Sequence, residues 1–104
     1  MKEIAINCDK MEWENASGYP SGTKIKVLCD DKSGRTILLK LPKGFTMEAH
    51  CHVKTEQHFV LEGQYKSGEQ LFGSQTYQLI PKGVTHGPFT SEKGATVLVI
   101  WNVS

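Results

Sequence analysis

The sequence lacks a long hydrophobic run, an excess of charge of either sign, and a set of paired cysteines. A helix that spans a bilayer needs about 20 consecutive apolar residues, and no stretch approaches that length. Twelve Lys and Arg against eleven Asp and Glu leave a formal net charge of +1, spread along the chain. No basic stripe is therefore present to neutralise phosphates. We expect neither a membrane nor a nucleic acid as a partner.

Cysteines are few and do not suggest pairing. Cys8, Cys29 and Cys51 are an odd number at wide spacings, without a CxxC pair. This pattern argues against a disulfide framework and favours reduced thiols. The N-terminal segment mixes charged and apolar residues and lacks the apolar core of a signal peptide. These features predict a cytoplasmic protein.

A sustained helical period is also missing from the sequence. Instead, short runs rich in Val, Ile, Leu, Thr and aromatic residues alternate with turns rich in Gly, Pro, Asp and Ser. This pattern predicts a single all-β domain over residues 1–104, either a sandwich or a barrel. The expected strands are 2–7, 24–29, 35–41, 45–53, 56–62, 75–80, 85–89 and 95–103.

Three histidines and one glutamate stand out against this pattern. His50 and His52 are two residues apart, so on an extended strand both imidazoles project from the same face, about 6.6 Å apart along the strand. Glu56 follows at the start of the next expected strand, after a short reversal, and His86 lies on a separate one. A barrel interior can bring side chains from three strands onto one ion. The expected metal ligands are His50, His52, Glu56 and His86.

Each of these residues also has a simpler interpretation. A histidine pair spaced like His50 and His52 arises by chance, and a histidine such as His86 near a Pro/Gly turn is often a solvated loop residue. A glutamate alone carries no information. The combination of all four with a frame of glycines and a proline favours the metal site.

That frame resembles the two sequence motifs of the cupin superfamily. Residues 44–63 match the first motif, G-x5-H-x-H-x3-E-x6-G, at every anchor. Residues 75–90 match the second motif in part, through its P-x-G-x2-H core from Pro81 to His86. Gln75 stands where that motif has a glycine, and Thr90 stands where it has an asparagine. The resemblance implies a cupin fold, which is a double-stranded β-helix or jelly-roll barrel.

Three imidazoles and a carboxylate suit one divalent transition-metal ion, Fe, Mn, Ni, Co, Cu or Zn, rather than Mg or Ca. The second motif and its surroundings look most like small cupins related to acetylacetone-cleaving dioxygenases and like the cupin domains of some anti-sigma factors. The resemblance therefore implies a metal-dependent oxygenase or related enzyme that acts on a small organic molecule. Two alternatives stay open. One is a non-catalytic module that senses a small molecule or a metal, and the other is a barrel with a purely structural ion.

Alternation along the expected strands adds two candidate catalytic residues. If His50 points inward, Glu48 and Thr46 point inward as well. In the same way, an inward Glu56 places His58 inward. Glu48 and His58 could move a proton or orient a ligand histidine. The alternatives are a solvated residue at the barrel mouth for Glu48 and a hydrogen-bonded interior residue for His58.

The expected partners are a small-molecule ligand or substrate and a second copy of the chain. Small cupins commonly dimerise, so the resemblance implies a homodimer. The expected strand 2–7 is the natural candidate to pair with the sheet of a partner, because such pairing covers an exposed edge with backbone hydrogen bonds.

Overall fold

The computed structural model describes residues 2–102 as one turn of 3-10 helix followed by short β-strands. The turn of 3-10 helix, η1, covers Cys8–Lys10. The strands are β1 (Glu14–Asn15), β2 (Lys24–Asp31), β3 (Gly34–Leu41), β4 (Phe45–Met47), β5 (Thr55–Gly63), β6 (Tyr65–Ser67), β7 (Gln70–Phe72), β8 (Tyr77–Ile80), β9 (Phe89–Ser91) and β10 (Ala95–Asn102).

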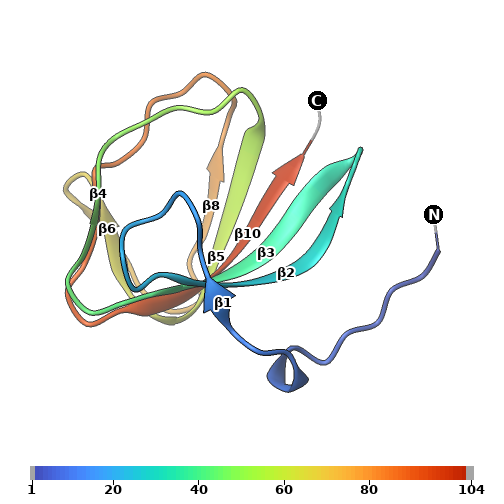
Figure 1. The fold of residues 1–104 in the computed structure, drawn as a ribbon. Helices are drawn as coiled ribbons and strands as arrows, with labels where there is room; N and C mark the ends of the chain where they lie inside the picture. Colours follow the sequence, from blue (N-terminus) through green and yellow to red (C-terminus); the bar gives the residue numbers. More distant parts are fainter. Residues whose placement is uncertain (1, 103–104) are drawn as a thin grey trace.

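Two antiparallel sheets form the barrel. The six-stranded sheet has the order β1-β2-β3-β10-β5-β8, and the four-stranded sheet has the order β4-β9-β6-β7. In Figure 1 the two sheets curve toward each other, with β4 and β6 opposite β8 and β5. The chain crosses between the sheets repeatedly, which is the connectivity of a jelly roll. The all-β jelly-roll expectation is confirmed.

Five of the expected strands are confirmed, with small shifts at their ends. They correspond to β2, β3, β5, β8 and β10, although residue 103 at the end of the last expected strand lies outside the described residues. The short hairpin of β6 and β7 was not expected from the sequence. Each of its strands has three residues, below the run of about 4–8 by which strands are recognised.

The expected strands 45–53 and 85–89 are wrong in extent, and the reason is a break in their shared ladder. β4 pairs with β9, with Met47 opposite Phe89, and the same register continues at an isolated bridge between His50 and His86. Between these two points the ladder meets Pro88, which has no N–H to donate. The segment around His50 is therefore joined to the one around His86 by one bridge instead of a continuous pair of strands.

The expected strand 2–7 is also wrong for the single chain. These residues are exposed, belong to no strand, and lead away from the barrel in Figure 1. At the neighbouring edge of the sheet, β1 pairs with only the first two residues of β2, Lys24 and Ile25. The rest of the β2 edge is unpaired among the described residues, and the segment 2–7 does not pair with it.

The core lies between the two sheets, on the inner faces of the three central strands. Val97 and Val99 of β10 lie opposite Leu39 and Ile37 of β3 on one side. On the other side Val99 lies opposite His58 of β5, so the same register places a histidine on the inner face. The buried apolar cluster is Ala16, Ile25, Ile37, Leu39, Leu41, Phe45, Val60, Tyr65, Phe89, Ala95, Val97 and Val99.

Two motif glycines allow a direct test of this geometry. Gly44 and Gly63 both have positive φ, +76° and +78°. A Cβ at Gly44 would meet nothing within 4 Å, whereas one at Gly63 would lie 2.4 Å from the carbonyl oxygen of Gly94. We expect Gly44→Ala to cost about 1–2 kcal/mol through backbone strain alone, and Gly63→Ala to cost roughly 1–3 kcal/mol more. Urea unfolding of both variants measures the difference, and equal losses would contradict the close approach of Gly63 to the β10 strand.

Candidate metal centre

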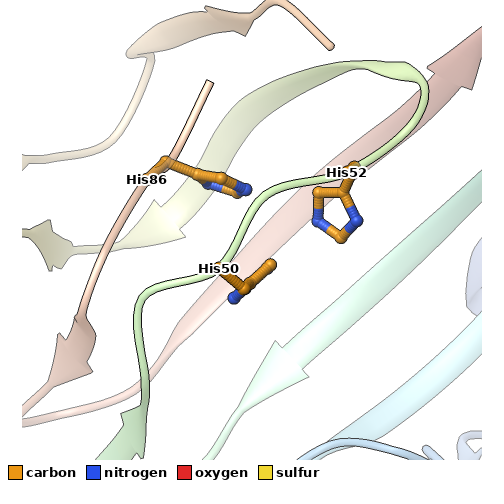
Figure 2. A group of neighbouring side chains, drawn as sticks. All are labelled: His50, His52 and His86. Atoms are coloured by element: carbon orange, nitrogen blue, oxygen red, sulfur yellow. The ribbon is translucent and has the colours of Figure 1, made fainter. Parts of the chain in front are cut away.

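Three histidines converge at the mouth of the barrel. His50 and His52 lie on the segment between β4 and β5, and His86 lies on the segment before β9 (Figure 2). The ring centroid of His50 lies 4.6 Å from that of His52 and 4.5 Å from that of His86. One ring nitrogen from each of the three residues lies within 4.8 Å of the others. The three imidazoles thus form a possible site for a divalent metal ion.

The backbone fixes two of these histidines relative to each other. His50 N–H donates to the His86 carbonyl at 2.9 Å, and His86 N–H donates to the His50 carbonyl at 2.9 Å. The Gly83 N–H donates to the carbonyl of His52 at 2.8 Å, which ties the third histidine to the Pro81–Gly83 turn. The site therefore depends on contacts between segments more than 30 residues apart in the sequence.

His50 is oriented by a second contact. Its Nδ1 lies 3.0 Å from the backbone carbonyl of Glu48, which can only accept, so Nδ1 carries the proton. The Nε2 of His50 then keeps its lone pair for a metal. The atom of Glu48 that contacts His50 is thus the backbone oxygen, while its side chain is exposed on the rim of the cavity.

His86 is the residue that most clearly needs a partner. It is 7% exposed, and neither of its ring nitrogens has a hydrogen-bond partner among the described residues. The pKa of His86 is lowered to about 4, and burial is the largest cause. The nearby Glu56 carboxylate opposes this shift, and the charges of His50 and His52 add to it. The imidazole is therefore neutral near pH 7. A buried polar group without a partner costs roughly 1–3 kcal/mol, and a metal ion at this position would satisfy the lone pair of one nitrogen.

Glu56 lies beside the histidines, at the start of β5. It is 4% exposed. Its Oε1 is 2.5 Å from Nε2 of His58, and its Oε2 is 2.8 Å from Nε2 of His52. The Oε2 contact lacks the geometry of a hydrogen bond, so this oxygen is buried without a hydrogen-bond partner among residues 2–102. Burial raises the pKa of Glu56, but the hydrogen bond with His58 and the charges of His58, His52 and His86 outweigh burial, and the net pKa is lowered. Glu56 is thus an anionic carboxylate with one oxygen unsatisfied.

His58 is buried next to Glu56, as the alternation along β5 predicts. Its Nδ1 lies 2.9 Å from the hydroxyl of Tyr65, which in turn donates to Oε1 of Gln78 at 2.9 Å. Burial is the main cause that raises the pKa of Tyr65, so its hydroxyl stays protonated. Tyr65 and Gln78 were not singled out from the sequence. The pairing of β5 with β8 sets His58 opposite Gln78, and Tyr65 reaches them from β6 of the other sheet.

The alternation expected for β4 is wrong by one residue. Phe45 is buried and Met47 packs against the core, whereas Thr46 between them is exposed. The strand ends at Met47, and the chain is irregular before the bridge at His50. The parity of inward and outward side chains is therefore not carried back from His50 to Thr46.

A cavity of about 610 Å³ opens beside the histidines. His50, His52 and His86 line it together with Glu56 and His58. Among the described residues, no lysine or arginine lines it. Much of the remaining lining is apolar, from the inner faces of both sheets and the loop after β1: Tyr19, Leu39, Leu41, Phe45, Met47, Phe89, Val97 and Val99.

The family of ChrR Cupin-like domains matches residues 1–102 of the chain. No curated protein matches the sequence. No helix in the described residues is long and apolar enough to cross a membrane.

Solved structures of cupins share the fold. A candidate acetylacetone dioxygenase from Methylibium petroleiphilum superposes with a TM-score of 0.87 at 17% identity, over 98% of this chain and 78% of that one. An RmlC-like cupin from Shewanella frigidimarina gives a TM-score of 0.83 at 18% identity, over 99% and 93% of the two chains. A chain from the complex of Rhodobacter sphaeroides SigE with the anti-sigma ChrR superposes with a TM-score of 0.74 at 19% identity, over 92% of this chain and 51% of that one. At these identities the likeness concerns the fold.

The lowered pKa of His86 predicts how the metal-free protein responds to acid. The folded pKa is about 4 against an ordinary 6.5, so between these values the unfolded chain binds more protons. The free energy of unfolding should therefore fall as the pH is lowered from about 6.5 to about 4, by roughly 1–3 kcal/mol from this group. Urea unfolding across this range should show a shallower loss in His86→Asn than in the parent. Parallel curves for the two proteins would contradict the account of His86.

Proposed function

We propose that this chain, which belongs to the family of ChrR Cupin-like domains, holds one divalent transition-metal ion. It would bind a small uncharged organic molecule beside that ion. The proposed activity is that of a metal-dependent oxygenase or a related enzyme. The observation that carries the proposal is the buried His86. Its two ring nitrogens lack partners among the described residues, while His50 and His52 each offer a ring nitrogen within 4.8 Å.

The proposed ligands are His50, His52, His86 and Glu56. All four line the same cavity, and the unsatisfied oxygen of Glu56 lies against His52. Neutral imidazoles with a carboxylate suit Fe, Mn, Ni, Co, Cu or Zn. When bound, such an ion acts as a Lewis acid and, for a redox-active metal, supports oxygen chemistry. The exposed thiol of Cys51 lies between two of the ligands in sequence, but it does not line the cavity.

The cavity lining supports an uncharged substrate. A carboxylate or phosphate substrate normally meets Arg or Lys, and neither residue type lines the cavity in the described part of the chain. Glu56 adds a negative charge, and the apolar walls exclude water from the bound molecule. A neutral molecule with two oxygens able to chelate an ion, such as a β-dicarbonyl or a phenol, fits this combination.

Two further residues have proposed roles toward that molecule. Tyr19 lines the cavity. The pKa of its hydroxyl is raised to about 12, mainly by burial; the charge of Glu56 adds to this shift, and the charge of Arg35 opposes it. Tyr19 therefore stays protonated and can donate a hydrogen bond to a substrate oxygen. Glu48, on the rim, is the candidate acid or base at the cavity mouth. His58, whose ring nitrogens both have partners, suits a positioning role better than proton transfer to the substrate.

The alternative function is a module that binds a small molecule or a metal without transforming it. The family match to the ChrR Cupin-like domain and the structural likeness to a chain of the SigE–ChrR complex favour this candidate. Three free cysteines agree with a cytoplasmic location for either function. The homodimer expected from the sequence stays a prediction, with the exposed Ile4 and Ile6 of the segment 2–7 as its candidate contacts.

Metal content tests the first part of the proposal. The gently purified protein should contain about one equivalent of a divalent transition metal, and a His50→Ala/His86→Ala double variant should contain none, because half of the proposed ligands are gone. Cys51→Ala is the matched control, since it removes a neighbouring exposed thiol that does not line the cavity, and it should keep the metal. Elemental analysis of the three proteins checks this. A parent that stays empty even when divalent ions are added would overturn the proposed function.

Ligand selectivity tests the second part. Neutral diketones and catechols should bind the metal-loaded protein at least about tenfold more tightly than analogues that carry an added carboxylate, because the cavity offers the carboxylate no cation. Calorimetric titration measures the affinities, and an oxygen electrode measures dioxygen uptake by the iron-loaded protein. Uptake with a neutral compound supports the enzyme, and binding without uptake supports the binding module. Tighter binding of the carboxylated analogues would contradict the proposed substrate class.

A further inference from the structure

A chain of hydrogen bonds runs from the proposed metal ligand Glu56 across the barrel interior. Glu56 Oε1 lies 2.5 Å from His58 Nε2, His58 Nδ1 lies 2.9 Å from the Tyr65 hydroxyl, and that hydroxyl lies 2.9 Å from Gln78 Oε1. The residues come from β5, β6 and β8, so the chain joins the two sheets. Glu56, His58 and Tyr65 are each less than 9% exposed.

The oxygens at the two ends of the chain, on Gln78 and Glu56, both act as acceptors. The amide oxygen of Gln78 only accepts, so Tyr65 gives its single hydroxyl proton to Gln78. The Tyr65 oxygen also lies 2.9 Å from Nδ1 of His58, within hydrogen-bond distance. The short contact between His58 Nε2 and Glu56 Oε1 also requires a proton between the two atoms. Glu56 Oε1 is thus occupied.

The two carboxylate oxygens of Glu56 are therefore not equivalent. Oε1 is engaged by His58, while Oε2 is buried without a hydrogen bond and lies 2.8 Å from Nε2 of His52, one of the three clustered histidines. Rotation of the carboxylate to offer both oxygens to one ion would break the bond to His58. The arrangement presents Oε2 alone to the histidine cluster.

We propose that His58, Tyr65 and Gln78 are positioning residues that hold Glu56 as a one-oxygen metal ligand. This inference rests on the proposed function, because it assumes that the histidine cluster and Glu56 bind an ion. A ligand that uses one oxygen instead of two leaves one more position on the ion for a substrate. Partners that orient a ligand typically contribute about 10–100-fold to metal affinity.

The ring of Tyr65 has a separate packing role. It is 3% exposed and lies against Phe72 and Phe89, with ring centroids at 5.6 and 5.8 Å. Tyr65→Phe keeps this ring and removes only the hydroxyl. Tyr77→Phe is a matched control, because it also removes one tyrosine hydroxyl that donates to a glutamine. The Tyr77 hydroxyl on β8 donates to Gln57 on β5 at 2.5 Å, but Tyr77 is 56% exposed and Gln57 does not line the cavity.

The test is the affinity of the parent, Tyr65→Phe and Tyr77→Phe for Co(II) and Zn(II), measured by competition with a chromophoric chelator. Tyr65→Phe should bind about tenfold or more weakly, and Tyr77→Phe should bind like the parent. Infrared difference spectra between the loaded and metal-free proteins supply a second readout. The separation of the carboxylate stretching bands should indicate one-oxygen binding in the parent and shift toward two-oxygen binding in Tyr65→Phe.

A second variant guards against a folding defect. Gln78→Leu changes a half-buried residue at the far end of the chain and should weaken metal binding in the same direction with an unchanged infrared spectrum of the backbone. If the parent binds metal and both variants match it in affinity and in the carboxylate bands, the positioning role is wrong while the proposed function stands. If the parent binds no metal, both proposals fall.

Discussion

Two backbone hydrogen bonds between His50 and His86 hold together the two segments that form the histidine cluster. They continue the register of β4 and β9 beyond the interruption at Pro88, and they bring the two imidazoles to a centroid distance of 4.5 Å. A shift of one residue in that pairing would turn the side chains to opposite faces. The site is therefore a consequence of strand register more than of local sequence.

The rest of the barrel surrounds the polar cluster with apolar side chains and leaves it few other hydrogen-bond partners. Glu56 and His58 lie on the inner face of β5, in line with Val60, and His58 faces Val99 of β10. Within that face, His58 satisfies one oxygen of Glu56, and nothing in the described residues satisfies His86. A buried polar group is normally paired. The unpaired atoms of Glu56 and His86 border the same cavity, which is where a metal ion would be bound.

Much of this arrangement was predictable from the sequence, and the limits are physical. The long strands β2, β3, β5 and β10 follow from apolar runs bounded by turns, and the alternation along β5 correctly buries both Glu56 and His58. The same rule failed for Thr46, because alternation holds only while the chain stays extended, and β4 ends at Met47. Local patterns cannot detect where a ladder is interrupted.

The hydrogen-bond chain beyond Glu56 lay outside sequence reasoning for another reason. His58, Tyr65 and Gln78 are separated by seven and then thirteen positions and belong to strands of two sheets. Tyr65 lies outside both motifs, and Gln78 stands at a position that the second motif leaves open. Their contact depends on the curvature of the barrel, which composition and spacing do not specify. The orientation of the carboxylate is thus a tertiary property, although the carboxylate itself was identified from its spacing.

X-ray absorption spectroscopy of the metal-loaded protein tests the central claim most directly, because it reports the atoms bound to the ion. The account predicts three imidazole nitrogens and carboxylate oxygen in the coordination shell, with any remaining ligands being light atoms from solvent or substrate. A sulfur ligand from one of the three cysteines, or a shell with fewer than three imidazoles, would contradict it.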